Sequence, residues 1–217
     1  IKKINMKIIK VMLVDDHAVV RAGYKILLKE EKNIEVIAEA SRGREAVQLA
    51  RENNYDVIVM DISLPDIGGI EAINRIMQEN NRNKILVFSM HEESVYAEQA
   101  LQAGAMGYLS KSTDPQLLSK AIKSIANGKK YIDDELKSRM SYGEKRTEDS
   151  QLSDLSTREF EIFCLLAEGL NTTDISKKLN ISYKTVANYS TQIKSKLGAS
   201  TVAEIAKIAI RHNIIKV

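Results

Sequence analysis

The pattern that most constrains this chain is a fivefold alternation of short apolar runs with longer amphipathic segments, which extends to residue 128. Short apolar runs predict buried strands, and the segments between them have the periodicity of helices. Strands that alternate with helices pair in parallel through right-handed crossovers, so the pattern predicts an α/β sheet covered on both faces. The predicted strands are Ile8–Val14, Ile34–Ala40, Val57–Met60, Lys84–Ser89 and Gly107–Leu109, and the predicted helices are Ala18–Glu30, Gly43–Glu52, Gly69–Gln78, Val95–Ala103 and Pro115–Asn127.

The chain after residue 128 has a different pattern. The segment "DDELKSRM" predicts one short helix, and the polar segment "SYGEKRTEDSQ" is typical of a surface linker. Beyond it the pattern is helical only, with Gly169, Asn180 and Gly198 as helix ends. We therefore predict an α/β domain over residues 1–128, a linker over residues 129–151 and an all-α four-helix domain over residues 152–217. The four predicted helices are Thr157–Glu168, Thr172–Leu179, Tyr183–Leu197 and Thr201–His212.

The charge of the chain is distributed unevenly between these parts. The formal net charge is +3, and all of this excess lies in residues 151–217, because the preceding residues hold equal numbers of basic and acidic side chains. Five lysines and no carboxylate lie between Asp174 and Glu204. This one-signed stretch indicates an anionic partner, with nucleic acid as the first candidate and a solvated helix face as the alternative.

Several classes of protein are disfavoured by the sequence. No apolar run approaches the roughly 18 residues that cross a bilayer, and the first residues lack the pattern of a signal peptide. The single cysteine, Cys164, lies in the apolar run Ile162–Ala167, which predicts a buried side chain rather than a reactive thiol. We therefore expect a cytoplasmic protein without a membrane partner.

Polar side chains follow four of the five predicted strands. Asp15 and Asp16 come after the first strand, Asp61 after the third, Ser89 at the end of the fourth and Lys111 after the fifth. The carboxyl ends of parallel strands meet at one edge of a sheet, where ligands bind. Three carboxylates there require a cation, and oxygen ligands favour a hard divalent ion such as Mg²⁺. A carboxylate can also accept a phosphoryl group, whose charge the metal, the lysine and the hydroxyl would stabilise.

The motifs "LVDDH", "VIVMDISLPDIGG", "LVFSMHE" and "GAMGYLSKS" resemble the receiver domain of two-component response regulators over about residues 6–128. The resemblance implies a flavodoxin-like, five-stranded parallel sheet in the order 2-1-3-4-5. It also implies that a sensor histidine kinase phosphorylates Asp61. The implied Mg²⁺ ligands are Asp16, Asp61 and the Ser63 carbonyl, with Asp15 assisting. The implied switch consists of Ser89, Tyr108 and Lys111, with the tyrosine moving inward on phosphorylation.

Alternatives with related chemistry fit the sequence less well. A phosphatase of the haloacid dehalogenase type has the pattern D-x-D, but Asp61 is followed by Ile62 and Ser63. The acidic first loop, "DDHAVVRAG", would repel the phosphate of FMN. A regulator that never uses phosphate, and an aspartyl-phosphate enzyme with an accessory helical domain, remain as rivals. Neither His17 nor His91 is predicted to bind metal, although His91 lies where it would shape water access to the phosphoryl group.

The C-terminal segment contains a helix-turn-helix pattern. Ile175 and Leu179 share one face of a short helix, a tight turn follows, and Ser182 is suited to cap the next helix. Residues 152–217 resemble the NarL/FixJ (LuxR-type) effector domain, whose second helix enters the major groove of double-stranded promoter DNA. The resemblance implies scaffold roles for Arg158 and Glu159. It implies DNA contacts from Lys184, Thr185, Asn188, Thr191 and Lys196.

The sequence departs from most of that family at two positions of the second helix. Ala187 and Tyr189 occupy positions that are usually basic and histidine, which makes the chain resemble the subgroup around the global regulators GacA and BvgA. Base recognition would then depend on Asn188, whose amide can pair with adenine. The last helix is the predicted dimer surface, with packing in the core as the alternative; its residues are Val202, Ile205, Ala206 and Ala209. The predicted function is phosphorylation-dependent transcription regulation by a homodimer, and no enzyme activity is expected.

Overall fold

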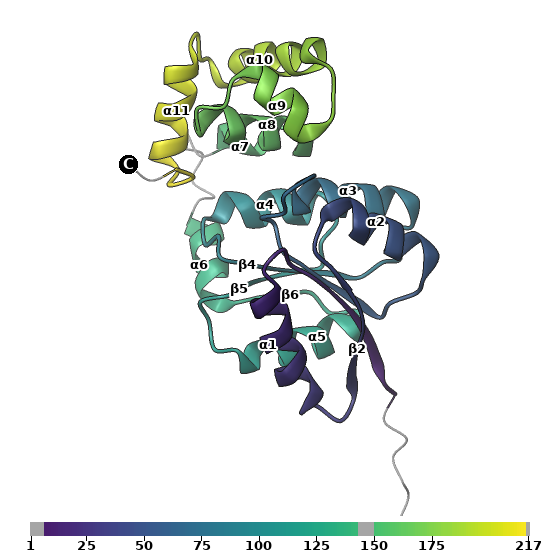
Figure 1. The fold of residues 1–217 in the computed structure, drawn as a ribbon. Coiled ribbons are helices and arrows are strands. Elements are labelled where there is room, and N and C mark those ends of the chain that lie inside the picture. The colour runs from purple at the N-terminus through teal and green to yellow at the C-terminus, as the bar shows by residue number, and fades with distance from the viewer. Residues whose placement is uncertain (1–6, 143–149, 216–217) are drawn as a thin grey trace, which may run out of the picture. The chain divides into compact units, whose positions relative to one another are not determined.

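The computed structural model describes residues 7–142 and 150–215. Contacts divide the chain into two compact units (Figure 1). The first unit contains Ile1–His91 and Ala100–Asp133, and the second contains Glu92–Gln99 and Asp134–Val217. Helix α4 (Ser94–Gln102) spans one division and α6 (Asp134–Tyr142) follows the other. Within the described ranges, no helix combines the length and apolar character needed to cross a membrane.

The first unit is built on a parallel sheet. Its strands lie in the order β2-β1-β3-β4-β5-β6, so the five predicted strands occur in the predicted order and a sixth strand is added. Each neighbouring pair of strands is parallel. The sixth strand has two residues, too few to produce a recognisable sequence pattern. The strands are β1 (Ile9–Val14), β2 (Ile34–Ala40), β3 (Val57–Met60), β4 (Ile85–Ser89), β5 (Gly107–Ser110) and β6 (Tyr131–Ile132).

Helices cover both faces of this sheet. Helices α1 (Ala18–Lys29) and α5 (Gln116–Ala126) pack on one face, where Leu28 and Ile122 join alternate residues of the strands in the core. Helices α2 (Gly43–Glu52) and α3 (Gly69–Glu79) lie on the other face (Figure 1). Because both faces are covered, all four residues of β3 are buried, which explains its uninterrupted apolar sequence.

The second unit contains the four predicted helices of the C-terminal segment. These are α8 (Thr157–Ala167), α9 (Thr172–Leu179), α10 (Tyr183–Leu197) and α11 (Val202–Arg211), preceded by the short α7 (Ser150–Ser153). Ser156 and Glu159 form a capping box at the start of α8, which agrees with the scaffold role expected of Glu159. The left-handed residues Asn180 (φ 53°) and Gly198 (φ 63°) end α9 and α10, as predicted.

Candidate functional site

Asp61 lies immediately after β3, at the carboxyl edge of the sheet. The residue is 3% exposed, and its Oδ1 atom accepts hydrogen bonds from the N–H groups of Ile62 (2.7 Å) and Ser63 (3.4 Å). Helix α3 begins so close to it that a Cβ at Gly69 would lie 2.0 Å from the Asp61 carbonyl oxygen. Glycine at position 69 therefore allows the loop to fold back against Asp61 and to hold its carboxylate at the end of the strand.

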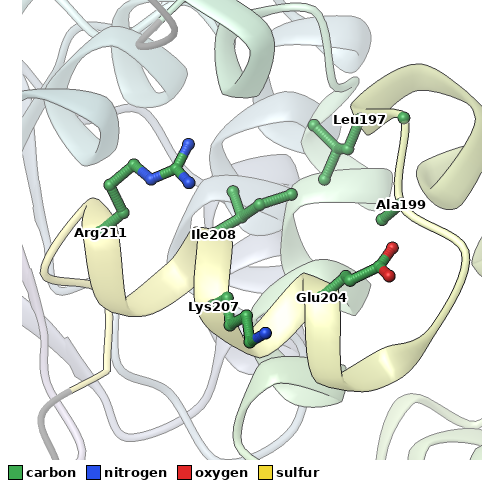
Figure 2. Close-up of a pocket in the computed structure, with 7 residues that line it drawn as sticks. Leu197, Ala199, Glu204, Lys207, Ile208 and Arg211 are labelled. Carbon is green, nitrogen blue, oxygen red and sulfur yellow. The ribbon is translucent and has the colours of Figure 1, made fainter.

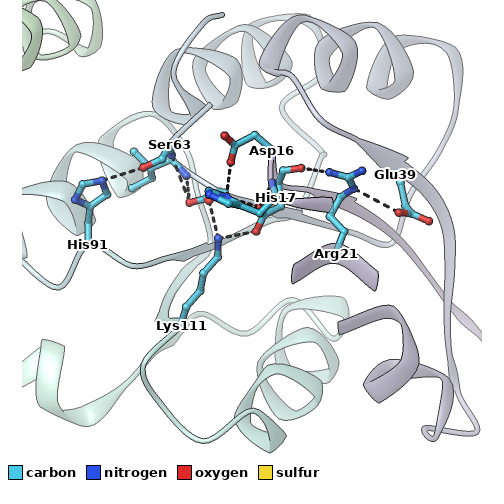
Figure 3. A network of polar contacts seen from close by, with 10 residues as sticks. Asp16, His17, Arg21, Glu39, Ser63, His91 and Lys111 are labelled. Carbon is cyan, nitrogen blue, oxygen red and sulfur yellow. Dashed lines mark hydrogen bonds and ion pairs between the residues drawn. The ribbon is translucent and has the colours of Figure 1, made fainter. Parts of the chain in front are cut away.

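Lys111 connects two of the three predicted carboxylates. Its Nζ atom lies 2.6 Å from Oδ2 of Asp15 and 2.6 Å from Oδ2 of Asp61, and all three side chains are at most 9% exposed (Figure 3). Burial alone would lower the pKa of Lys111, but the negative charges of Asp61 and Asp15 outweigh it and raise this pKa. Lys111 is therefore a permanent cation at neutral pH, placed where a transferred anionic group would arrive.

The acidic cluster is suited to a divalent cation. Ligand atoms of Asp15, Asp16, His17 and Asp61 lie within 4.8 Å of one another. Three carboxylates against one ammonium leave two negative charges, which one divalent ion would neutralise. The His17 imidazole, whose Nδ1 lies 2.7 Å from Asp16 Oδ1, was not predicted to join this cluster. Its only sequence signal was its position directly after the aspartate pair.

The predicted switch residues lie beside the cluster. Ser89 ends β4 and Tyr108 lies in the neighbouring β5, and both residues are fully buried. The Tyr108 hydroxyl donates to the His91 carbonyl oxygen (2.8 Å), and the His91 N–H donates to Ser89 Oγ (3.4 Å). The tyrosine therefore has the inward position that was expected to follow phosphorylation.

Helix α10 presents a polar face suited to a groove of DNA. Ser182 caps the helix, as predicted, by accepting from the Thr185 N–H (3.0 Å). The predicted residues Lys184, Asn188 and Thr191 are exposed along one face, whereas Thr185 is only partly exposed. The same face also carries the exposed residues Gln192 and Ser195, which were not predicted. Their signal in the sequence is helical spacing, since they follow Asn188 by four and seven residues.

Two protein families match the sequence. The response regulator receiver domain matches residues 11–123, and the luxR family of bacterial regulatory proteins matches residues 153–209. The response regulator UvrY of Escherichia coli (strain K12) is 39% identical over 208 residues, 95% of each chain. The response regulator GacA of Pseudomonas aeruginosa is 33% identical and spans 95% of this chain and 98% of its own.

Solved structures of response regulators also match this chain. A LuxR-family two-component response regulator from Aurantimonas sp. SI85-9A1 is 40% identical with a TM-score of 0.62, and the match covers 64% of this chain and 99% of that one. A second match is RcsB of Salmonella enterica serovar Typhimurium, bound to promoter P1flhDC in the presence of the phosphomimetic BeF3⁻. It is 25% identical with a TM-score of 0.71, and the match covers 96% of this chain and 99% of that one.

The chain belongs to the NarL/FixJ family of response regulators. A response regulator of this family is a DNA-binding transcription regulator that receives a phosphoryl group from a histidine kinase, and is not an enzyme. The family, the two fold classes and this function were all predicted from the sequence motifs. The resemblance to the subgroup that includes GacA is confirmed as well.

Lys196, which is predicted to contact DNA, also has partners within its own unit in the structure of this response regulator. Its ammonium lies 2.6 Å from Oε2 of Glu159 and 3.2 Å from the Asp154 carbonyl oxygen, so it is engaged within its own unit. Burial would raise the pKa of Glu159, but hydrogen bonds from Lys196 and from the Ser156 N–H outweigh it and lower this pKa. Lys196 therefore stabilises the start of α8, because Glu159 completes the capping box there.

Replacing Lys184 and Lys196 by alanine should separate DNA binding from stability. Lys184→Ala should reduce the salt dependence of DNA binding by about one unit of slope, because the phosphate contact predicted for Lys184 would be lost, and should leave stability unchanged. Lys196→Ala should cost about 1 kcal/mol of stability, since the buried Glu159 carboxylate loses its cation. Salt titrations of DNA binding and urea unfolding measure the two effects. Equal losses of salt slope in both variants would contradict the assignment.

Helix α11 of this response regulator also differs from the prediction. Ile205 and Ala209 are fully buried, because they pack inside their own unit, and cannot form a dimer surface. Val202 (40% exposed), the partly exposed Ala206 and Ile210 (41% exposed) form an outward-facing apolar stripe beside them. The predicted dimer residues therefore lie on two adjacent faces of α11: Ile205 and Ala209 face the core, and Val202 and Ala206 face outward.

A pocket of about 290 Å³ opens on a third side of α11, at its junction with the end of α10 (Figure 2). Its wall combines apolar Leu197 and Ile208 with charged Glu204, Lys207 and Arg211. It includes none of the predicted dimer or DNA contacts, and its Glu204 carboxylate accepts from the Ser200 N–H (2.6 Å). The pocket is therefore separate from both the polar face of α10 and the apolar stripe of α11.

Proposed function

We propose that the histidine kinase phosphorylates this response regulator on Asp61. The observation that carries the proposal is the buried Asp61 carboxylate, 2.6 Å from Lys111 at the carboxyl edge of the sheet. Asp15, Asp16, Asp61 and the Ser63 carbonyl would hold Mg²⁺, the divalent ion to which oxygen ligands and a phosphoryl group are suited. Bound there, Mg²⁺ would supply positive charge that offsets the negative charge of the carboxylates and of the incoming phosphoryl group.

The residues of this chain then act by position and charge. An Asp61 oxygen forms the new bond to phosphorus while the bond from phosphorus to the donor histidine nitrogen breaks. Lys111 stabilises the charge on the phosphoryl oxygens, and its pairing with Asp15 keeps its ammonium beside Asp61. The Ser89 hydroxyl donates to a phosphoryl oxygen, and phosphorylation favours the state in which Tyr108 is buried, so these two residues form a two-state switch.

The output of the switch is dimerisation and promoter binding. The proposed homodimer forms through the exposed stripe Val202, Ala206 and Ile210 of α11, because pairing two DNA-binding units raises their combined affinity. The receiver is assigned residues 1–128, the linker residues 129–151 and the DNA-binding domain residues 152–217; the family matches at 11–123 and 153–209 lie inside these ranges. The protein would act in the cytoplasm, where promoter DNA lies.

Within α10, we assign phosphate contacts to Lys184 and base recognition to Asn188. Both are exposed on the polar face, where Thr191 and Gln192 extend the contact surface. An asparagine amide can pair bidentately with adenine, whereas a lysine at the start of the helix positions it on the backbone. The promoter complex of RcsB supports this use of the helical domain.

Asn188→Ala should reduce discrimination at one base pair by about 1–3 kcal/mol and preserve salt-dependent non-specific binding, because only a base contact is removed. Binding to a set of single-base operator variants measures the change. Lys184→Ala is the matched comparison, since it should weaken all sequences alike. A uniform loss of affinity in Asn188→Ala would contradict the assignment.

The function as a whole is tested by promoter binding of the full chain with and without acetyl phosphate and Mg²⁺. Binding should increase when the chain is phosphorylated. Equal binding in both states would instead support the rival, a regulator that binds DNA constitutively.

A further inference from the structure

Two loops at the carboxyl edge of the sheet are joined by a side-chain hydrogen bond. Ser63 lies in the loop between β3 and α3, and His91 lies in the loop after β4. The Ser63 Oγ atom is 3.1 Å from His91 Nε2 (Figure 3). We call this contact the Ser63–His91 bridge.

The main chain of His91 connects the bridge to the switch. Its carbonyl oxygen accepts from the Tyr108 hydroxyl (2.8 Å), and its N–H donates to Ser89 Oγ (3.4 Å). The preceding residue, Met90, is 67% exposed, so packing of its side chain does little to fix this part of the loop. Hydrogen bonds are therefore important in setting the position of the His91 carbonyl, and with it the acceptor that Tyr108 uses.

The other end of the bridge is firmly held. The Asp66 carboxylate accepts from the N–H groups of Gly43 (2.8 Å) and Arg44 (3.1 Å), which fastens the β3–α3 loop to the start of α2. The Ser63 N–H also points to the Asp61 carboxylate (3.4 Å). The bridge thus connects the loop that carries the His91 carbonyl to a fixed loop beside the phosphoacceptor.

We propose that the Ser63–His91 bridge positions the His91 carbonyl and thereby favours the buried position of Tyr108 before a phosphoryl group arrives. His91 is a positioning residue in this proposal, which rests on the proposed role of Asp61. If phosphorylation and the buried tyrosine favour each other, a contact that stabilises the buried tyrosine must also strengthen binding of a phosphoryl group at Asp61. The bridge would then set how readily the receiver is activated.

The test is calorimetric titration of the full chain with beryllofluoride, a phosphoryl mimic, in the presence of Mg²⁺. Ser63→Ala and His91→Ala should each bind about fivefold more weakly, the factor expected for one neutral hydrogen bond. The double variant should bind no more weakly than either single variant, because both remove the same contact. His91→Gln should recover most of the affinity, and Met90→Ala, in the same loop, should bind like the wild type.

A second pair of variants tests whether the bridge acts through the Tyr108 hydroxyl. Tyr108→Phe lacks the hydroxyl that bonds to the His91 carbonyl, so adding His91→Ala to it should change the affinity by less than twofold. Two outcomes would overturn the proposed role of the bridge and leave the role of Asp61 intact. One is additive losses of affinity in the Ser63 and His91 double variant, and the other is wild-type affinity in both single variants. A wild-type chain that binds no beryllofluoride would overturn both the bridge and the role of Asp61.

Discussion

Replacing Asp61 with asparagine is expected to abolish phosphorylation of this response regulator. Asparagine preserves the size of the side chain but lacks the carboxylate oxygen that would form the bond to phosphorus. It also removes one of the two negative charges that Lys111 contacts at 2.6 Å. With acetyl phosphate and Mg²⁺, intact mass spectrometry should show an added phosphoryl group on the wild type and none on the variant, and the increase in promoter binding should disappear.

Asp66→Asn is the matched control for this loss. Asp66 lies in the same loop, five residues after Asp61, but its carboxylate bonds to the start of α2 rather than to the acidic cluster. This variant should still accept a phosphoryl group. Phosphoryl mass on the Asp61→Asn chain would remove Asp61 from its proposed role and direct attention to Asp15 or Asp16.

Shortening Ile205 should destabilise the C-terminal helices by about 2–5 kcal/mol, because a fully buried isoleucine leaves a cavity when it is cut back to alanine. Ile210→Ala, at a 41% exposed position of the same helix, should change stability by less than about 0.5 kcal/mol and weaken dimerisation instead. Hydrogen exchange of the α8 and α11 amides reports the stability of this unit directly. Sedimentation of the phosphorylated chain reports the dimer.

These two variants separate the two faces of α11. If Ile205→Ala left hydrogen exchange unchanged and abolished the dimer, the buried assignment would be wrong and the original dimer surface would stand. If Ile210→Ala dimerised like the wild type, the exposed stripe would not be the dimer contact.

Much of the receiver fold was predictable because parallel strands buried on both faces have continuous apolar sequences. The run Val57–Met60 is such a strand, and every residue in it is buried. Convergence of Asp15, Asp61 and Lys111 followed from the same topology, since the carboxyl ends of parallel strands share one edge. The site was thus predicted by the order of the strands rather than by local sequence.

The features that the sequence did not predict depend on which side chains meet in the folded chain, and the periodicity of the sequence does not show this. A lysine such as Lys196 has the same sign whether it binds a phosphate or Glu159, and only the packing of α8 against α10 decides between them. Ile205 and Val202 lie on adjacent faces of α11, so their periodicity merges into one stripe although one is buried and the other is exposed. The Ser63–His91 contact joins two loops, where no periodicity exists.

The short strand β6 has a consequence for the solubility of the folded receiver. Without it, β5 would lie at the sheet edge with a row of unpaired N–H and C=O groups, to which a strand of another molecule could add. Gly107 permits this protection, since a Cβ there would lie 2.3 Å from the Tyr131 carbonyl oxygen. With only two residues, β6 itself offers little length for edge-to-edge pairing, and it covers the edge of β5 at Gly107 and Tyr108 at small cost in chain length.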